Sequence, residues 1–414
     1  MSARMLKRTT GTPPRWSARH VSYLLGIETS CDDTAAAVLD QDGRVLSNVL
    51  SSQWELHAKW KGIVPALAAR AHAENLPRVM HAAIAQRKEL MDASGLTSVK
   101  DLSAVAVTSG PGLAPCLDVG LQTARQMCLD HRHLAFLQIH HLELDTRRPE
   151  FPFLVLLVSG GHCCLVLATS LGTYELLGKT VDDSIGEAYD KVARMLHLTS
   201  SGNISVHSGK LIEQLAARGN DRAFPFTEPM KHRKVKPTRF SCNTELSGCI
   251  CAQDCNFSYS GIKTAMLREV TKVLVAMGTE ETDIIPLGTL DERTKEDLCA
   301  SFQRLNRYCI NQRVAVNQLI TRTRRACRWS KERVGSNIST LVVCGGVASN
   351  QYLRDRIRAA VQGEGVVAVF PPPQYCTDNG VMVAWAGLER YAQGMRSDPA
   401  SARYQPRWPL EQML

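Results

Sequence analysis

Two loops in the sequence carry groups that could bind a phosphate or a metal ion. The first, Thr29-Ser30-Cys31-Asp32-Asp33, offers two carboxylates and two hydroxyls directly after an apolar run. The second, Gly345-Gly346, follows another apolar run, and Asn350 lies in the first turn of the helix expected after it. Backbone N–H groups at the start of a helix bind anions, and glycine lets a ligand approach them closely. We therefore expect a nucleotide or phosphate site, with an exposed hairpin tip as the alternative for the first loop.

A third glycine loop and a histidine pair extend this chemistry. Leu157-Val158-Ser159-Gly160-Gly161 lets backbone approach a ligand, although a tight turn explains the same residues. His140 and His141 follow the apolar run Leu134–Ile139, and Asp378 lies in Cys376-Thr377-Asp378-Asn379-Gly380. Histidine and aspartate together suit zinc or iron, and a structural histidine pair is the alternative. The sequence has neither a Walker A motif nor H-E-x-x-H, which argues against a P-loop nucleotidase and a zincin-type peptidase.

Strand and helix patterns indicate which elements position these loops. Apolar runs predict strands at 23–28, 34–39 and 45–50, and the arrangement recurs about 130 residues later at 153–158, 163–168 and 174–177. Helical spacing predicts helices at 63–90, 116–129, 187–196, 210–217, 348–361 and 379–392. The recurrence indicates an internally duplicated α/β protein with two related lobes around a central cleft.

Length, charge and the ends of the chain bound its class. The 414 residues, 44% of them hydrophobic, suit a globular protein. No apolar run approaches the roughly 18 residues of a spanning helix, so we expect no membrane span. The formal net charge is +9, and five basic residues lie within residues 1–20, which hold no Asp or Glu. This start is typical of a mitochondrial transit peptide, with a disordered basic tail as the alternative.

The fourteen cysteines do not form a disulfide pattern. Many lie in apolar runs, as small hydrophobic residues do, and we expect them to be reduced. Cys242, Cys249, Cys251 and Cys255 lie in the polar stretch 230–255, and their spacing matches no standard zinc pattern well. We interpret this stretch as a solvated insertion.

A series of short motifs runs through the chain in a fixed order. The series comprises Gly26–Thr34, Ser52-Gln53, Gly62–Pro65, Ala69–His72, Gly110–Leu113, His140–Glu143, Val158–His162, Asp182–Lys191, Phe257–Thr264, Gly345–Asn350 and Cys376–Gly380. Together these motifs resemble the tRNA N6-adenosine threonylcarbamoyltransferase family. With the acid-free basic start, the chain is most similar to the mitochondrial members.

The resemblance implies a duplicated actin-like ATPase fold, with a transit peptide at 1–21. It implies a first lobe at 22–150, completed by a C-terminal helix at about 378–395, and a second lobe at 151–377. It also implies a reaction, in which the threonylcarbamoyl group of threonylcarbamoyl-AMP moves to N6 of the adenosine 3′ of the anticodon and AMP leaves. The implied substrates are mitochondrial tRNAs that read codons starting with A. A separate synthase would supply the adenylate, and the enzyme would be a homodimer.

The family's functional residues fall on matching positions of this sequence. Its substrate loop falls on Leu157, Val158, Ser159, Gly160 and Gly161, and its ribose and adenine contacts fall on Asp190, Gly209, Glu213 and Asn350. Its metal ligands, for one divalent zinc or iron ion per subunit, fall on His141 and Asp378 and on position 145.

The sequence departs from the family pattern at three places. Position 145 is Asp145 where the family has histidine, and the loop around it is several residues short. Ser208 replaces the first glycine of a Gly-Gly pair, and the stretch 230–255 is longer than in the family. Two other functions are therefore open: a degenerate nucleotide- or tRNA-binding paralogue, and an actin-like ATPase or kinase.

Overall fold

A computed structural model describes the protein in two units. The described residues are 23–58, 60, 62–86, 98–140, 149–198, 208–220, 222–225, 255–278, 290–304, 314–334 and 338–407. Unit 1 comprises Met1–Glu143 and Asp378–Trp408, and unit 2 comprises Leu144–Thr377 and Pro409–Leu414. The expected transit peptide and residues 230–254 of the expected insertion lie outside the described residues.

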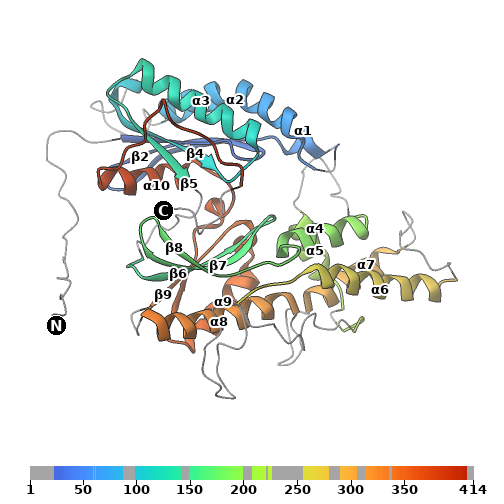
Figure 1. Ribbon diagram of the computed structural model, residues 1–414. Coiled ribbons are helices and arrows are strands. Elements are labelled where there is room, and N and C mark those ends of the chain that lie inside the picture. The colour runs from blue at the N-terminus through green and yellow to red at the C-terminus, as the bar shows by residue number, and fades with distance from the viewer. Residues whose placement is uncertain are drawn as a thin grey trace, which may run out of the picture. The chain divides into compact units, whose positions relative to one another are not determined.

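Unit 1 is built on a five-stranded mixed sheet in the order β3-β2-β1-β4-β5 (Figure 1). Its strands are β1 (Tyr23–Glu28), β2 (Asp33–Asp40), β3 (Val45–Ser52), β4 (Leu102–Gly110) and β5 (Ala135–His140). The first three strands pair antiparallel, whereas β4 and β5 run parallel to β1. The carboxyl ends of β1, β4 and β5 therefore lie at the same edge of the sheet.

Helices cover both faces of this sheet. Alternate residues of β1 point to opposite faces, so Leu25 and Ile27 pack with α2 (Pro65–Gln86) and α3 (Ala114–Asp130) in one buried cluster. Leu24 and Gly26 face α10 (Gly380–Ala392) instead. The short helices α1 (Trp54–Ala58) and η2 (Val99–Asp101) complete the unit.

Unit 2 repeats the same sheet topology, in the order β10-β9-β6-β7-β8. The strands are β6 (Phe153–Val158), β7 (Cys163–Ser170), β8 (Thr173–Lys179), β9 (Thr340–Cys344) and β10 (Val367–Val369). Again three strands form an antiparallel meander, and β9 and β10 run parallel to the first of them. The duplicated α/β architecture expected from the sequence is confirmed.

The helices of unit 2 differ in part from the expectation. They are α4 (Ile185–Met195), α5 (Ser208–Ala216), α6 (Ser260–Ala276), α7 (Glu292–Arg304), α8 (Val314–Val334), η4 (Gly346–Ser349), α9 (Gln351–Gln362) and η5 (Pro373–Tyr375). The predicted helix at 348–361 is wrong at its start, because a 3₁₀ turn intervenes and Asn350 caps α9. Three helices, α6, α7 and α8, were not predicted.

Two properties of the described residues bear on the protein's class. None of their helices is long and apolar enough to cross a membrane. Their cysteines are free thiols, and all but Cys31 are buried. Burial raises the pKa of most of these thiols, for example to about 11 for Cys116 and Cys128, so they behave as small apolar side chains.

Candidate functional site

In unit 1 the turn after β1 is anchored by a buried glutamate. Glu28 is fully buried, and its carboxylate accepts hydrogen bonds from the Ser30 N–H and the Thr108 hydroxyl, each at 2.5 Å. Thr29 donates from its hydroxyl to the Cys116 carbonyl at the start of α3, at 2.9 Å. These bonds fix the loop Thr29–Asp33 at the sheet edge where β1 and β4 end.

A second buried network holds the same loop from α2. His72 Nε2 lies 3.0 Å from the Cys31 carbonyl oxygen, which only accepts, so Nε2 carries the proton. Its Nδ1 then accepts, 2.8 Å from the Thr34 hydroxyl and 3.1 Å from Gln53 Nε2. The imidazole, Thr34 and Gln53 are all buried, and burial is the largest effect that lowers the pKa of His72. His72 is therefore a neutral positioning residue for the loop.

Helix α10 brings Asp378 to this edge of the sheet. A Cβ on Gly26 would lie 2.4 Å from both the Gly380 carbonyl oxygen and the Ala384 amide nitrogen, so β1 and α10 touch through their backbones. Further along the helix, a Cβ on Gly387 would lie 3.0 Å from Leu24. The helix therefore runs opposite to β1, and its first turn lies beside the carboxyl end of that strand. Asp378 directly precedes the N-cap, Asn379.

The loop and the start of α10 concentrate negative charge. The pKa of the Cys31 thiol is raised above its ordinary value first by burial, and then by the carboxylates of Asp32, Asp378 and Glu28. Cys31 is consequently a neutral thiol and a poor nucleophile at physiological pH. Carboxylates gathered at one edge are the oxygen donors that a divalent cation accepts.

The metal ligands implied by the resemblance are only partly described. Asp378 lies at the acidic edge, and β5, which leads to His141, ends at this edge with His140 paired to Gly110. His141 and Asp145 lie outside the described residues. Within the residues that are described, no three His, Cys, Asp or Glu side chains form a group that could hold a metal. The carboxylate of Asp378 is an oxygen donor of the kind that a cation accepts.

In unit 2 the predicted substrate loop is the turn between β6 and β7. The Ser159 N–H donates to the His162 carbonyl at 2.7 Å, and the His162 N–H donates to the Ser159 hydroxyl at 2.9 Å. Gly160 and Gly161 are exposed, and a Cβ at either position would meet nothing within 4 Å. Backbone is therefore open to a ligand at these two glycines.

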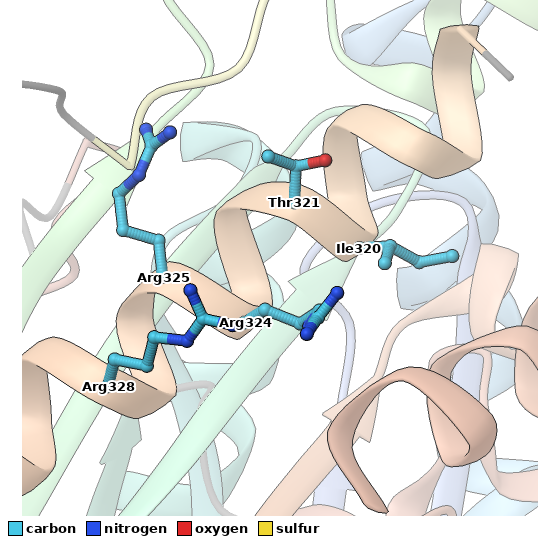
Figure 2. A pocket seen from close by; sticks show the side chains of 5 residues that line it. All are labelled: Ile320, Thr321, Arg324, Arg325 and Arg328. Atoms are coloured by element: carbon cyan, nitrogen blue, oxygen red, sulfur yellow. The ribbon is translucent and has the colours of Figure 1, made fainter. Parts of the chain in front are cut away.

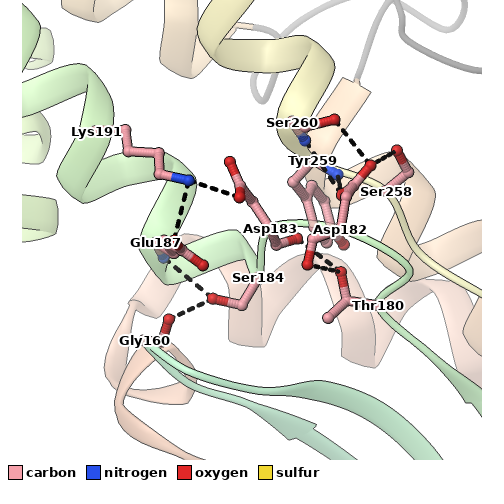
Figure 3. A network of polar contacts seen from close by, with 10 residues as sticks. All are labelled: Gly160, Thr180, Asp182, Asp183, Ser184, Glu187, Lys191, Ser258, Tyr259 and Ser260. Carbon is pink, nitrogen blue, oxygen red and sulfur yellow. Dashed lines mark hydrogen bonds and ion pairs between the residues drawn. The ribbon is translucent and has the colours of Figure 1, made fainter.

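Residues at the start of α4 hold this turn in place. Ser184 caps the helix by accepting from the Glu187 N–H at 3.2 Å, and its hydroxyl donates to the Gly160 carbonyl. A Cβ on Gly186 would lie 2.6 Å from Gly160 Cα, so only glycine permits this packing. Figure 3 shows the hydrogen bond from Ser184 to Gly160 and the ion pairs of Lys191 with Asp183 and Glu187, whose lengths are 2.6 and 3.0 Å. Ser184 thus fastens the start of α4 to the turn, and Lys191 joins α4 to Asp183, the residue before the cap.

The carboxylate of Asp182, which follows β8, fixes the start of α6 (Figure 3). Asp182 accepts from the Tyr259 and Ser260 N–H groups at 2.7 and 3.2 Å, and also from the Ser258 and Ser260 hydroxyls. Burial opposes ionisation of this carboxyl, but these hydrogen bonds outweigh it and hold its pKa below the ordinary value. With its oxygens occupied in this way, Asp182 has a structural role.

The structure joins two of the predicted adenylate contacts directly. Asn350 caps α9 by accepting from the Leu353 N–H at 2.9 Å, and its amide donates to Glu213 Oε1 on α5 at 3.1 Å. Before it, Gly345 has φ +95°, and a Cβ there would lie 2.3 Å from the Val158 carbonyl oxygen. The ends of β6 and β9 therefore pack through backbone, as glycine alone allows.

The remaining predicted contacts lie on the adjoining helices. Asp190 is half-buried on α4, and Gly209 lies in the first turn of α5, where a Cβ would meet nothing within 4 Å. The two helices pack against one another. Sequence reasoning missed the positioning roles of Ser184 and His72, although Ser184-x-x-Glu187 is a helix-capping signal.

The family model of the tRNA N6-adenosine threonylcarbamoyltransferases matches residues 44–385 of this chain. The chain belongs to this family. The resemblance found in the ordered motifs is thereby confirmed, and so is the prediction of a transferase.

Curated relatives match this threonylcarbamoyltransferase-family chain over nearly its whole length. A probable mitochondrial tRNA N6-adenosine threonylcarbamoyltransferase of Arabidopsis thaliana is 41% identical and covers 94% of this chain and 74% of its own. The mitochondrial enzyme of Homo sapiens is 38% identical over 94% of this chain and 86% of its own. Among solved structures, T. kodakarensis HypF aligns with a TM-score of 0.48 and 13% identity, over 91% of this chain and 48% of that chain.

Proposed function

We propose that this chain transfers the threonylcarbamoyl group from threonylcarbamoyl-AMP to N6 of the adenosine 3′ of the anticodon. Its substrates are mitochondrial tRNAs that read codons starting with A, and AMP is released. The observation that carries the proposal is the family match over residues 44–385, which includes residues of both units. The names of the relatives in plant and human support a mitochondrial location, with residues 1–21 as transit peptide.

The adenylate binds unit 2 through the turn after β6. Exposed backbone N–H groups of Gly160 and Gly161 donate to the anionic part of the substrate, because no Cβ blocks the approach. Leu157, Val158 and Ser159 form the rest of the loop. Asn350 and Glu213, already joined at 3.1 Å, take the ribose and adenine together with Asp190 and Gly209. A pre-formed contact of this kind lowers the entropic cost of binding.

Asp378, His141 and Asp145 would hold one divalent zinc or iron ion. An ion held there would supply Lewis-acid polarisation of the carbonyl or an anchor for the phosphate. Aspartate in place of histidine exchanges a nitrogen donor for an oxygen donor at position 145, and zinc and iron accept either. Hydrogen bonds of Glu28 and His72 hold the acidic loop Thr29–Asp33 in place. The enzyme acts as a homodimer with a separate synthase that supplies the adenylate.

The test is direct. Purified protein is given tRNA transcript, threonylcarbamoyl-AMP and zinc or iron, with a family member that carries histidine at the position of Asp145 as the control. We expect the modified adenosine, detected by mass spectrometry of nucleosides, and one bound metal per chain. No product from this chain under conditions where the control is active would refute the proposal. An Asp145→His variant that alone restores metal and product would assign the failure to position 145.

A further inference from the structure

One face of α8 carries a dense group of arginines. The opposite face of the helix is buried in the core of unit 2 at Leu319, Thr323 and Ala326, which recur at helical spacing. The outward side chains Ile320, Thr321, Arg324, Arg325 and Arg328 line a hollow of about 150 Å³ (Figure 2). We call Thr321, Arg324, Arg325 and Arg328 the arginine face.

A single carboxylate organises this face. Glu364, on the turn between α9 and β10, accepts from Arg324 Nε at 2.8 Å and from Arg328 Nε and NH2 at 2.9 and 2.7 Å. Its side chain is 10% exposed, whereas those of Arg324 and Arg328 are 44% and 46% exposed. Glu364 therefore fixes the two guanidinium groups from behind, and their outer N–H edges stay open to solvent.

The positive charge of the face exceeds what the ion pairs neutralise. Lys331 also points to this turn and donates to the Glu364 backbone carbonyl at 2.5 Å. Three cationic side chains, Arg324, Arg328 and Lys331, thus contact one glutamate, a formal surplus of two positive charges. Like charges three and four residues apart on a helix repel, so the arrangement costs stability unless an anion occupies the surface.

The geometry identifies the class of anion. Pre-oriented guanidinium forks match the oxygens of a phosphate, and a threonine hydroxyl adds a further donor. The hollow has room for several waters or one phosphate group. Its lining has no aromatic side chain on which a base would stack, so it contacts backbone without reading sequence.

We infer that the arginine face of α8 binds a backbone phosphate of the tRNA substrate. The inference rests on the proposed function, because tRNA is the polyanion which that function brings to the enzyme. A phosphodiester contact of this kind would position the tRNA, and it would act alike on every tRNA that the enzyme modifies.

The test measures tRNA binding by Arg324→Gln in the full-length protein. Arg328 keeps both of its bonds to Glu364 in this variant, so folding is preserved. We expect the Kd for tRNA to rise about 3- to 10-fold and the slope of log K against log salt to fall by about 0.7–0.9, one phosphate contact. Arg324→Lys keeps the charge and should retain most of the slope.

The matched control is Arg293→Gln. Arg293 lies on α7, is 64% exposed and pairs with Glu296 and Asp297, so the same charge is removed from a helix surface without an arginine face. Equal Kd and salt slope for Arg324→Gln and Arg293→Gln would overturn the inference. Loss of binding to anionic phospholipid vesicles, with tRNA binding unchanged, would overturn it in favour of a membrane surface.

Wild-type protein separates this inference from the proposed function. If wild-type protein forms the modified base and the two variants Arg324→Gln and Arg293→Gln have equal Kd and salt slope, only the inferred phosphate site is refuted. If wild type neither binds nor modifies tRNA, both fail.

Discussion

The backbone contact between β1 and α10 predicts a large effect of one added methyl group. Gly26→Ala places a Cβ 2.4 Å from the Gly380 carbonyl oxygen, 2.4 Å from the Ala384 nitrogen and 2.7 Å from the Ala384 Cβ. Both of the closest atoms belong to helix backbone, so no side-chain rotation relieves the clash. Ordinary contact requires α10 to move outward by roughly 1 Å.

The magnitude follows from two opposing effects. Overpacking of a well-packed core costs about 1–3 kcal/mol, and contacts with rigid backbone put Gly26→Ala at the upper end. Replacing glycine also restricts the unfolded chain, which offsets about 0.4–1 kcal/mol. We expect a net loss of about 2 kcal/mol, which lowers Tm by about 4–8 °C at 2–4 °C per kcal/mol.

The assay is thermal unfolding, with transferase activity as the second readout. Gly62→Ala is the control, because a Cβ at Gly62 would meet nothing within 4 Å. Since α10 begins beside Asp378, an outward shift displaces that carboxylate too, and a misplacement of about 1 Å can reduce activity by about 100-fold. A Tm for Gly26→Ala within 1 °C of that for Gly62→Ala would refute the packing of α10 on β1.

Three further predictions concern the loops. His72→Phe leaves Thr34 and Gln53 without their partner and should cost about 2–4 kcal/mol in urea unfolding. Because the pKa of His72 is lowered in the fold, the stability of the wild-type protein should fall as the pH drops below about 6.5. The His72→Phe variant should lose this part of the pH dependence. If the pH dependence of stability is unchanged in the variant, the imidazole of His72 is not neutral in the fold. Ser184→Ala removes the α4 cap and the bond to Gly160, and should cost about 1 kcal/mol and raise KM for the adenylate more than it lowers kcat. Asn350→Asp sets a second carboxylate against Glu213 and should weaken AMP binding in calorimetry; adding Glu213→Gln should restore it, and no restoration would exclude their coupling.

Sequence patterns predicted the sheets better than the helices of unit 2. The strand expected at 23–28 has those bounds in the structure, because alternating burial against helices on both faces demands a continuous apolar run. Helix α8 escaped prediction because its buried positions include Thr323, Cys327 and Ser330, which do not read as an apolar stripe. The bond of Glu28 to Thr108 and that of His72 to Cys31 could not be predicted, since these partners lie 80 and 41 residues away in the chain.

The duplicated topology explains how one backbone plan carries two kinds of chemistry. In both units a glycine that follows a parallel strand packs closely against backbone at the end of the first strand. After β4, a Cβ on Gly112 would lie 2.6 Å from the Ser30 carbonyl oxygen. After β9, a Cβ on Gly345 would lie 2.3 Å from the Val158 carbonyl oxygen. The equivalent turns differ in charge. The turn after β1 carries carboxylates and lies near Asp378, which suits a cation, whereas Ser159–His162 has none and exposes glycine backbone, which suits an anion. Reversing the charge of either turn, without a change in its backbone fold, should therefore reverse whether the turn prefers a cation or an anion.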